Sequence, residues 1–194
     1  MTGSIPDWFS ELSDLEQFIV FENNLTGPLP DPLPSSMILF DVSFNQISGT
    51  IPIKLWSESD SPTKIERMYL DHNLLTGTIP NSTQLRQDMQ RLWLNDNYGL
   101  NGTIPTNFGQ AWSRLSELQL HHTNVTGQLG PVTPDLQNIS ASTELCRLVW
   151  PNLTILKANC WQMSAKDIPP VYCECCTLCE SVNGRKRRRQ RKQR

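Results

Sequence analysis

One pattern of apolar residues, asparagine, glycine and proline recurs along the first two-thirds of the chain. Its first copy reads Leu15-x-x-Phe18-x-Val20-x-x-Asn23-x-Leu25-x-Gly27-x-Leu29-Pro30. Later copies align on Asn45, Asn73 and Asn97, and a weaker copy aligns on Thr123, with successive offsets of 22, 28, 24 and 26 residues. A period of this size is typical of repeat solenoids, in which each unit buries its apolar side against its neighbours.

Each copy predicts a short strand followed by a turn. Apolar and polar residues alternate in the first half of the pattern, so a strand would turn its apolar side inward. The asparagine side chain can bond to backbone groups that leave the strand ladder, and the glycine lets the chain bend where a Cβ would intrude. We therefore expect an α/β-type repeat solenoid with short parallel strands on a concave face and loops or 3-10 turns on the convex side.

The end of the repeat carries a family resemblance. Leu75-x-Gly77-x-Ile79-Pro80 resembles the plant-type leucine-rich repeat of receptor-like proteins and receptor kinases, and the likeness covers roughly residues 1–130. The resemblance implies a leucine-rich repeat horseshoe outside the cell or at its surface, which recognises a protein, peptide or glycan partner without catalysis. The alternative is a structural or adhesive wall glycoprotein with no discrete ligand.

The pattern also predicts the organisation of the chain. Residues 1–14 form a partial repeat, because Thr2-Gly3-Ser4-Ile5-Pro6 matches the end of a copy. Leucine-rich repeats follow over 15–130, then a last degenerate repeat with a cysteine-rich cap over 131–180 and a basic disordered tail over 181–194. Because the chain starts within a repeat, we expect a fragment whose signal or anchor lies upstream. No run of about 18 apolar residues predicts a membrane-spanning helix.

All six cysteines lie in the last third of the chain: Cys146, Cys160, Cys173, Cys175, Cys176 and Cys179. Their even number at a solenoid end favours disulfides, and the sequence does not determine which cysteines pair. A zinc site and reduced thiols are the alternatives. The segment Leu153 to Cys160, followed by the C-x-C-C-T-x-C run, is similar to the C-terminal cap of algal leucine-rich repeat proteins. That resemblance implies a last strand and a disulfide-closed cap, and a helix is expected over Ser142 to Trp150.

Glycosylation and charge bear on location and partners. Six N-x-S/T sequences occur, at Asn24, Asn81, Asn101, Asn124, Asn138 and Asn152.

The tail from Arg185 to Arg194 holds eight basic residues, which leaves 9 basic against 19 acidic residues and a formal charge of −10 in the rest. The acidic body is not expected to bind nucleic acid. Four interpretations of this tail stay open: a solvated end, a contact for anionic lipid or polyanion, a basic processing site, or a nuclear signal.

We expect no catalytic site, cofactor or metal. No Ser–His–Asp group, carboxylate pair or phosphate loop stands out. His121 and His122 project near Asp71 and Asp96, but consecutive strand residues point to opposite faces, so these are interpreted as surface histidines.

Side chains that flank the inward leucines should align in outward columns across the repeats. One column reads Ile19, Asp41, Tyr69, Trp93, Gln119 and Lys157, and the next reads Phe21, Ser43, Asp71, Asn95 and His121. Tyr69 and Trp93 would be neighbouring exposed aromatics, and such residues often anchor binding partners. We expect them to centre the recognition surface, with polar contacts from Asp71, Asn95 and His121 and further partner contacts from Gln119 and Asp41. Alternatively, the two rings only stack on each other and stiffen the sheet.

Overall fold

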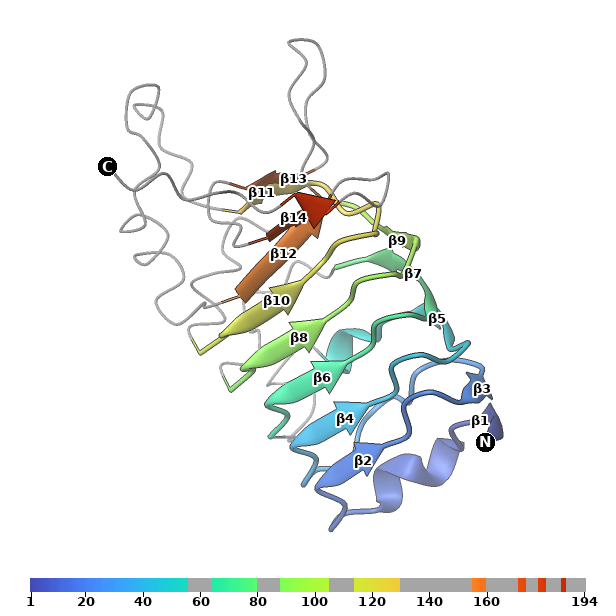
Figure 1. Ribbon diagram of the computed structural model, residues 1–194. Helices are drawn as coiled ribbons and strands as arrows, with labels where there is room; N and C mark the ends of the chain where they lie inside the picture. Colours follow the sequence, from blue (N-terminus) through green and yellow to red (C-terminus); the bar gives the residue numbers. More distant parts are fainter. Residues whose placement is uncertain are drawn as a thin grey trace.

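The computed structural model describes residues 1–55, 64–79, 88–104, 114–129, 155–159, 171–173, 178–180 and 186–187 (Figure 1). Within these ranges the principal feature is an eight-stranded sheet. Its strands, in spatial order, are β2 (Gln17–Ile19), β4 (Leu39–Asp41), β6 (Arg67–Tyr69), β8 (Arg91–Trp93), β10 (Glu117–Gln119), β12 (Ile155–Asn159), β14 (Leu178–Glu180) and β15 (Lys186–Arg187). All neighbours pair in parallel except β14 and β15. This arrangement confirms the predicted solenoid of stacked parallel strands.

A second set of short strands lies along the opposite edge of the turns (Figure 1). The pairs and triplet are β1 (Thr2–Ser4) with β3 (Asn24–Thr26), β5 (Ser48–Thr50) with β7 (Leu74–Thr78) and β9 (Gly99–Asn101), and β11 (Gly127–Leu129) with β13 (Val171–Cys173). Two 3-10 helices complete the described elements, η1 (Asp7–Glu11) and η2 (Ile53–Leu55). The glycine-containing half of the repeat therefore forms strands as well, where only loops and 3-10 turns were expected.

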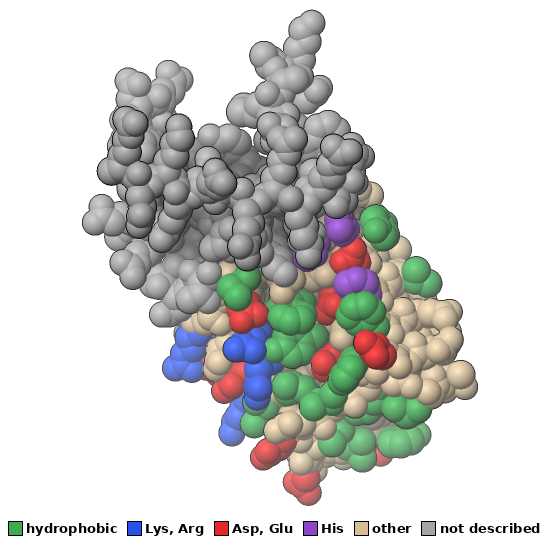
Figure 2. All heavy atoms as spheres, viewed as in Figure 1, with side chains coloured by type: hydrophobic (Ala, Val, Ile, Leu, Met, Phe, Trp, Pro, Cys, Tyr) green, Lys and Arg blue, Asp and Glu red, His purple; other side chains and the backbone are tan. Residues whose placement is uncertain are grey.

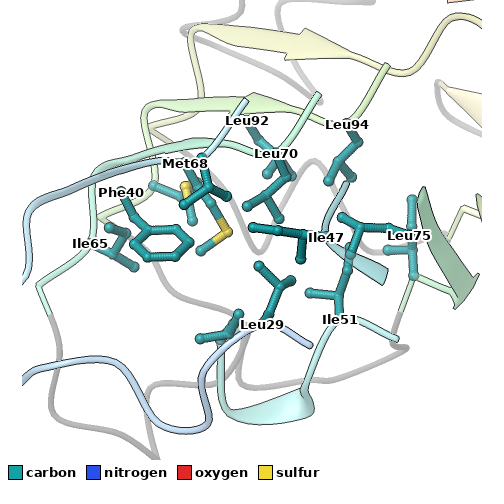
Figure 3. Packing of buried hydrophobic residues seen from close by; sticks show 14 of the residues in the cluster. Leu29, Phe40, Ile47, Ile51, Ile65, Met68, Leu70, Leu75, Leu92 and Leu94 are labelled. Carbon is teal, nitrogen blue, oxygen red and sulfur yellow. The ribbon is translucent and has the colours of Figure 1, made fainter. Parts of the chain in front are cut away.

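The core is a column of apolar side chains between the two sets of strands (Figure 3). The second, third and fourth copies bury the residues that the pattern marks as apolar, whereas Leu15, Phe18 and Val20 of the first copy are only partly buried. In the third copy the buried residues are Ile65, Met68, Leu70, Leu75 and Ile79, none more than 3% exposed. Removing a leucine-sized side chain from water contributes roughly 1.5–3 kcal/mol, so burial across successive turns is the main stabilising term.

A row of asparagine amides joins consecutive turns. Asn73 Nδ2 donates to the carbonyl of Leu70 in its own turn at 3.2 Å and to that of Val42 in the preceding turn at 3.0 Å. Asn73 Oδ1 accepts from the backbone N–H of Ile47 at 2.9 Å. Asn45 and Asn97 make the equivalent bonds one turn earlier and one turn later. The expected bonding of these side chains to backbone outside the ladder is confirmed.

Gly77 shows why the repeat needs glycine on the second set of strands. Its φ is +83°, and an added Cβ would lie 2.9 Å from Cγ2 of Thr50 in the preceding turn. Both the backbone conformation and the close approach therefore favour a residue without a side chain.

The C-terminal part is described only in short pieces. The expected last strand after Leu153 is confirmed as β12, Ile155–Asn159. Cys173 and Cys179 belong to β13 and β14, whereas the other four cysteines and the expected helix over Ser142 to Trp150 lie outside the described residues. Within the segment expected to be a disordered tail, Lys186–Arg187 form β15. No helix of the described residues is long and apolar enough to span a membrane.

Candidate recognition surface

The strand register aligns the predicted outward columns. Along the main sheet, Ile19, Asp41, Tyr69, Trp93, Gln119 and Lys157 are consecutive partners. The second column continues this register beyond the strand ends. The carbonyls of this column accept backbone hydrogen bonds from the preceding turn. His72 N donates to Asn95 O at 3.0 Å, and Asp96 N donates to His121 O at 3.0 Å. Side chains that are far apart in the sequence therefore form two adjacent rows on the concave face.

Tyr69 and Trp93 are in contact, as their position in the first column predicts. Their ring centroids lie 4.6 Å apart with planes inclined by 59°. Trp93 Nε1 donates to Oε2 of Glu117 at 3.2 Å, and Arg91 Nε lies 3.5 Å from Oε1 of the same carboxylate. The neighbouring Tyr69 hydroxyl and Glu117 carboxylate raise the pKa of Arg91. The rings are half-buried rather than fully exposed, because they cover each other and Glu117 holds the edge of Trp93.

Exposed apolar side chains extend this aromatic pair toward the N-terminal turns. Ile19 and Phe21 are each 50% exposed and Phe44 is 45% exposed. Figure 2 shows hydrophobic side chains gathered over this face, with Lys and Arg on one side, His on the other, and Asp and Glu on both. Contiguous exposed apolar surface of this kind marks interaction sites in soluble proteins.

The polar residues expected to contact a partner are less accessible. Asp71, Asn95, Gln119 and His121 are all buried, between 3% and 7% exposed. Asp41 is half-buried, and its Oδ1 accepts from the backbone N–H of Ser43 at 3.1 Å and from its Oγ at 2.7 Å. Their part in partner binding stays a prediction.

The interpretation of the histidines as surface residues is wrong for His121, which is only 7% exposed, and His122 is half-buried. The reason is a left-handed residue that every described turn places just before its asparagine or threonine. These residues are Glu22, Phe44, His72, Asp96 and His122, with φ between 52° and 57°. Strand alternation ends at this residue, so His121 and His122 both approach Asp96 instead of pointing to opposite faces.

Asp96 lies at the centre of this polar group. Its Oδ1 is 2.6 Å from His122 Nδ1, and its Oδ2 is 3.3 Å from His72 Nε2 and 3.8 Å from His121 Nε2. Asn95 Nδ2 also donates to Oδ2 at 2.8 Å. Burial disfavours the ionised form of Asp96, but the hydrogen bonds from Asn95 and His122 and the nearby His72 outweigh it and lower its pKa.

Asp71, one turn earlier, shows the opposite balance. Its Oδ2 lies 3.0 Å from His72 Nδ1. Burial nevertheless raises the pKa of Asp71, despite the hydrogen bond and charge of His72. The two carboxyl groups therefore differ in acidity although they occupy neighbouring turns.

Three of the six expected glycosylation sites fall on described residues. Asn24, Asn101 and Asn124 are exposed and lie on or beside the second set of strands, away from the main sheet. Asn81, Asn138 and Asn152 lie outside the described residues.

Proteins similar to this chain are found among plant receptors. Receptor-like protein 34 of Arabidopsis thaliana is 28% identical over 139 residues, which cover 60% of this chain and 14% of that protein. The structure of a TDR receptor superposes with a TM-score of 0.61 at 26% identity, covering 81% of this chain and 25% of that chain. The chain has the leucine-rich repeat fold and is similar to plant receptor-like proteins and receptor ectodomains. No protein-family model matches it.

A further solved structure adds a bound partner. The leucine-rich repeat ectodomain of the plant membrane receptor kinase GASSHO1/SCHENGEN3 from Arabidopsis thaliana, in complex with Casparian strip integrity factor 2, has a TM-score of 0.54 and 27% identity. The match covers 66% of this chain and 14% of that chain. This leucine-rich repeat chain thus spans about one-seventh of the length of the curated relatives it matches.

Proposed function

We propose that this chain is a non-catalytic, extracellular recognition module that binds a protein or peptide on its concave face. The observation that carries the proposal is the contact between the half-buried rings of Tyr69 and Trp93 on the main sheet, with the exposed apolar side chains of Ile19, Phe21 and Phe44 toward the N-terminal turns. Aromatic residues of this kind supply most of the binding energy in many interfaces, because they bury a large area at low entropic cost. The neighbouring polar groups would then fix the orientation of the partner.

Two further observations support recognition over a purely adhesive role. The described glycosylation sequences Asn24, Asn101 and Asn124 lie off the main sheet, so glycans there would leave the concave face open. A receptor ectodomain that is similar over 66% of this chain is complexed with Casparian strip integrity factor 2.

The test begins with selection of ligands. A displayed library of random peptides is panned against the immobilised chain, and the affinities of the selected peptides are measured by biolayer interferometry. Trp93→Ala and Tyr69→Ala should each weaken binding by roughly 1–3 kcal/mol, or about 5- to 150-fold. Trp93→Phe keeps a ring but loses the bond to Glu117, so it should weaken binding less.

Trp8→Ala is the matched control. Trp8 is 57% exposed but lies in η1, outside the main sheet, so its removal should leave affinity unchanged. Wild-type affinity for Trp93→Ala, with its melting temperature preserved, would exclude the aromatic pair as the binding centre. Binding to an array of wall oligosaccharides, with no peptide selected, would contradict the protein or peptide assignment.

A further inference from the structure

Three side chains that can coordinate a metal ion, from two neighbouring turns, meet at the end of the second column. Asp96, His121 and His122, here termed the Asp96 cluster, each place one ligand atom within 4.8 Å of the other two. The turns that carry them are joined by a backbone bond from Asp96 N to His121 O. This group lies beside the aromatic pair but shares no residue with it.

The donor set has a definite metal preference. Two imidazole nitrogens and one carboxylate suit Zn²⁺ and other first-row divalent ions, whereas Ca²⁺ and Mg²⁺ prefer oxygen alone. In a tetrahedral zinc site with bonds near 2.0–2.1 Å, ligand atoms lie about 3.3 Å apart. His122 Nδ1 lies 2.6 Å from Oδ1 of Asp96 and His121 Nε2 lies 3.8 Å from its Oδ2, so the two imidazoles approach different oxygens of one carboxylate. Coordination of one ion by both nitrogens and this carboxylate therefore requires these side chains to rotate.

Buried oxygens beside the cluster give a second, independent indication of a cation. Within the part of the chain that the structure describes, Asp71 Oδ1 and Asn95 Oδ1 are buried and have no hydrogen-bond partner. Both residues are more than nine-tenths buried. Asn95 Nδ2 donates to Asp96 directly, whereas Asp71 Oδ2 contacts His72, whose Nε2 lies 3.3 Å from Asp96 Oδ2. Buried acceptors without donors are costly, and a nearby positive charge reduces that cost.

The backbone holds the ligands in place before any ion arrives. Asp96 and His122 have φ of 56° and 57°, in the left-handed region, where residues other than glycine are strained. That conformation is what brings His122 to the same side as His121. Glu22, Phe44 and His72 adopt the same conformation in their own turns, so the repeat itself fixes the backbone on which these ligands lie.

We propose that Asp96, His121 and His122 bind one Zn²⁺ ion, with Asn95 orienting the Asp96 carboxylate. Three protein ligands leave the fourth tetrahedral position for water or for a donor group of a bound partner. The site does not depend on recognition by Tyr69 and Trp93. Without an ion, the same residues form the hydrogen-bonded group described above.

Zinc titration of the full chain, freed of any histidine tag, tests the proposal by isothermal calorimetry. Asp96→Asn and His122→Ala should each lower zinc affinity at least tenfold, and Asp88→Asn is the matched control. Asp88 is an accessible carboxylate paired with Arg114, in the same part of the chain but outside the cluster. Wild-type zinc affinity in both cluster variants would overturn the site.

Zinc bound by cysteines must be distinguished from zinc at the cluster. Co²⁺ held by nitrogen and oxygen lacks the thiolate charge-transfer absorption that cysteine ligands give, so the cluster should bind Co²⁺ without that band. A readout that needs no variant uses the three histidines of the chain. In long-range ¹H–¹⁵N spectra, one equivalent of Zn²⁺ should shift ring nitrogens of His121 and His122 more strongly than those of His72, which contacts Asp96 but is not a proposed ligand. Unchanged histidine spectra, or zinc bound only with the thiolate band, would refute the proposal.

Discussion

Removing the Asn73 side chain should reveal how much the asparagine row contributes to stability. The side chain is buried, and its amide serves the carbonyls of Val42, Leu70 and Asp71 and the backbone N–H of Ile47. Asn73→Ala leaves the N–H of Ile47 without its partner, whereas the three carbonyls keep bonds from Asn45, Asn97 and the Phe44 N–H. A buried unsatisfied group costs about 1–3 kcal/mol, so the variant should lose about that much unfolding free energy.

Two measurements check this magnitude. Urea denaturation followed by circular dichroism gives the global loss, and amide hydrogen exchange at Ile47 reports the local loss, which matters because repeat arrays can unfold in parts. Asn73→Thr is the internal comparison, since Thr123 occupies the same point in its own turn. Its hydroxyl donates to Leu120 O at 2.7 Å.

Asn73→Thr should therefore fall between the wild type and Asn73→Ala. A hydroxyl has one hydrogen to donate, so it can replace the bond within the turn but not the additional amide bond to the preceding turn. The reasoning is refuted if Asn73→Ala costs less than about 1 kcal/mol, or if the threonine variant is as unstable as the alanine variant.

Two other perturbations test the backbone and the electrostatics. Gly77→Ala should lose about 1–3 kcal/mol of unfolding free energy in thermal denaturation, because its φ is +83° and its Cβ would meet Thr50. Gly3→Ala is the comparison, since its φ is +93° but no heavy atom lies within 4 Å, and it should lose less. Equal losses in the two variants would argue against the steric cause. Because burial raises the folded-state pKa of Asp71 above its unfolded value, its ionisation costs stability above that folded-state pKa, and the cost is absent below about pH 4. Asp71→Asn, measured in EDTA, should melt higher than wild type near pH 7 and lose this advantage as the pH falls toward about 3; a constant difference across that range would contradict the assigned cause.

The repeat pattern was sufficient to predict the register. Each strand is aligned by its inward leucines, so aligning the sequence on its asparagines also aligns the outward residues. That is why Tyr69 and Trp93 are neighbours as predicted, and why Lys157 lies beside Gln119 even though the segment between them carries no clear repeat. Periodicity determines alignment because a one-residue slip would turn the apolar side outward.

Periodicity could not predict accessibility or the conformation of the turns. Alternation describes strands, yet His121 and His122 lie where the strand has ended and a left-handed residue reverses the expected direction. The burial of Gln119 and the half-burial of Trp93 depend on what the neighbouring side chains cover, including the bond from Trp93 to Glu117. A column of non-glycine residues before the asparagines is visible in the sequence, but nothing in their identities indicates a positive φ.

That left-handed column offers a site for protein engineering. Residues as different as Glu22, Phe44 and Asp96 adopt the same conformation in successive turns. The surrounding ladder therefore imposes the backbone geometry, at a cost of about 1–2 kcal/mol for each non-glycine side chain. The positions recur at the spacing of adjacent strands, about 4.8 Å, and none belongs to the buried apolar cluster. A designer could install a chosen row of ligands or contact residues along this edge without altering a single core residue.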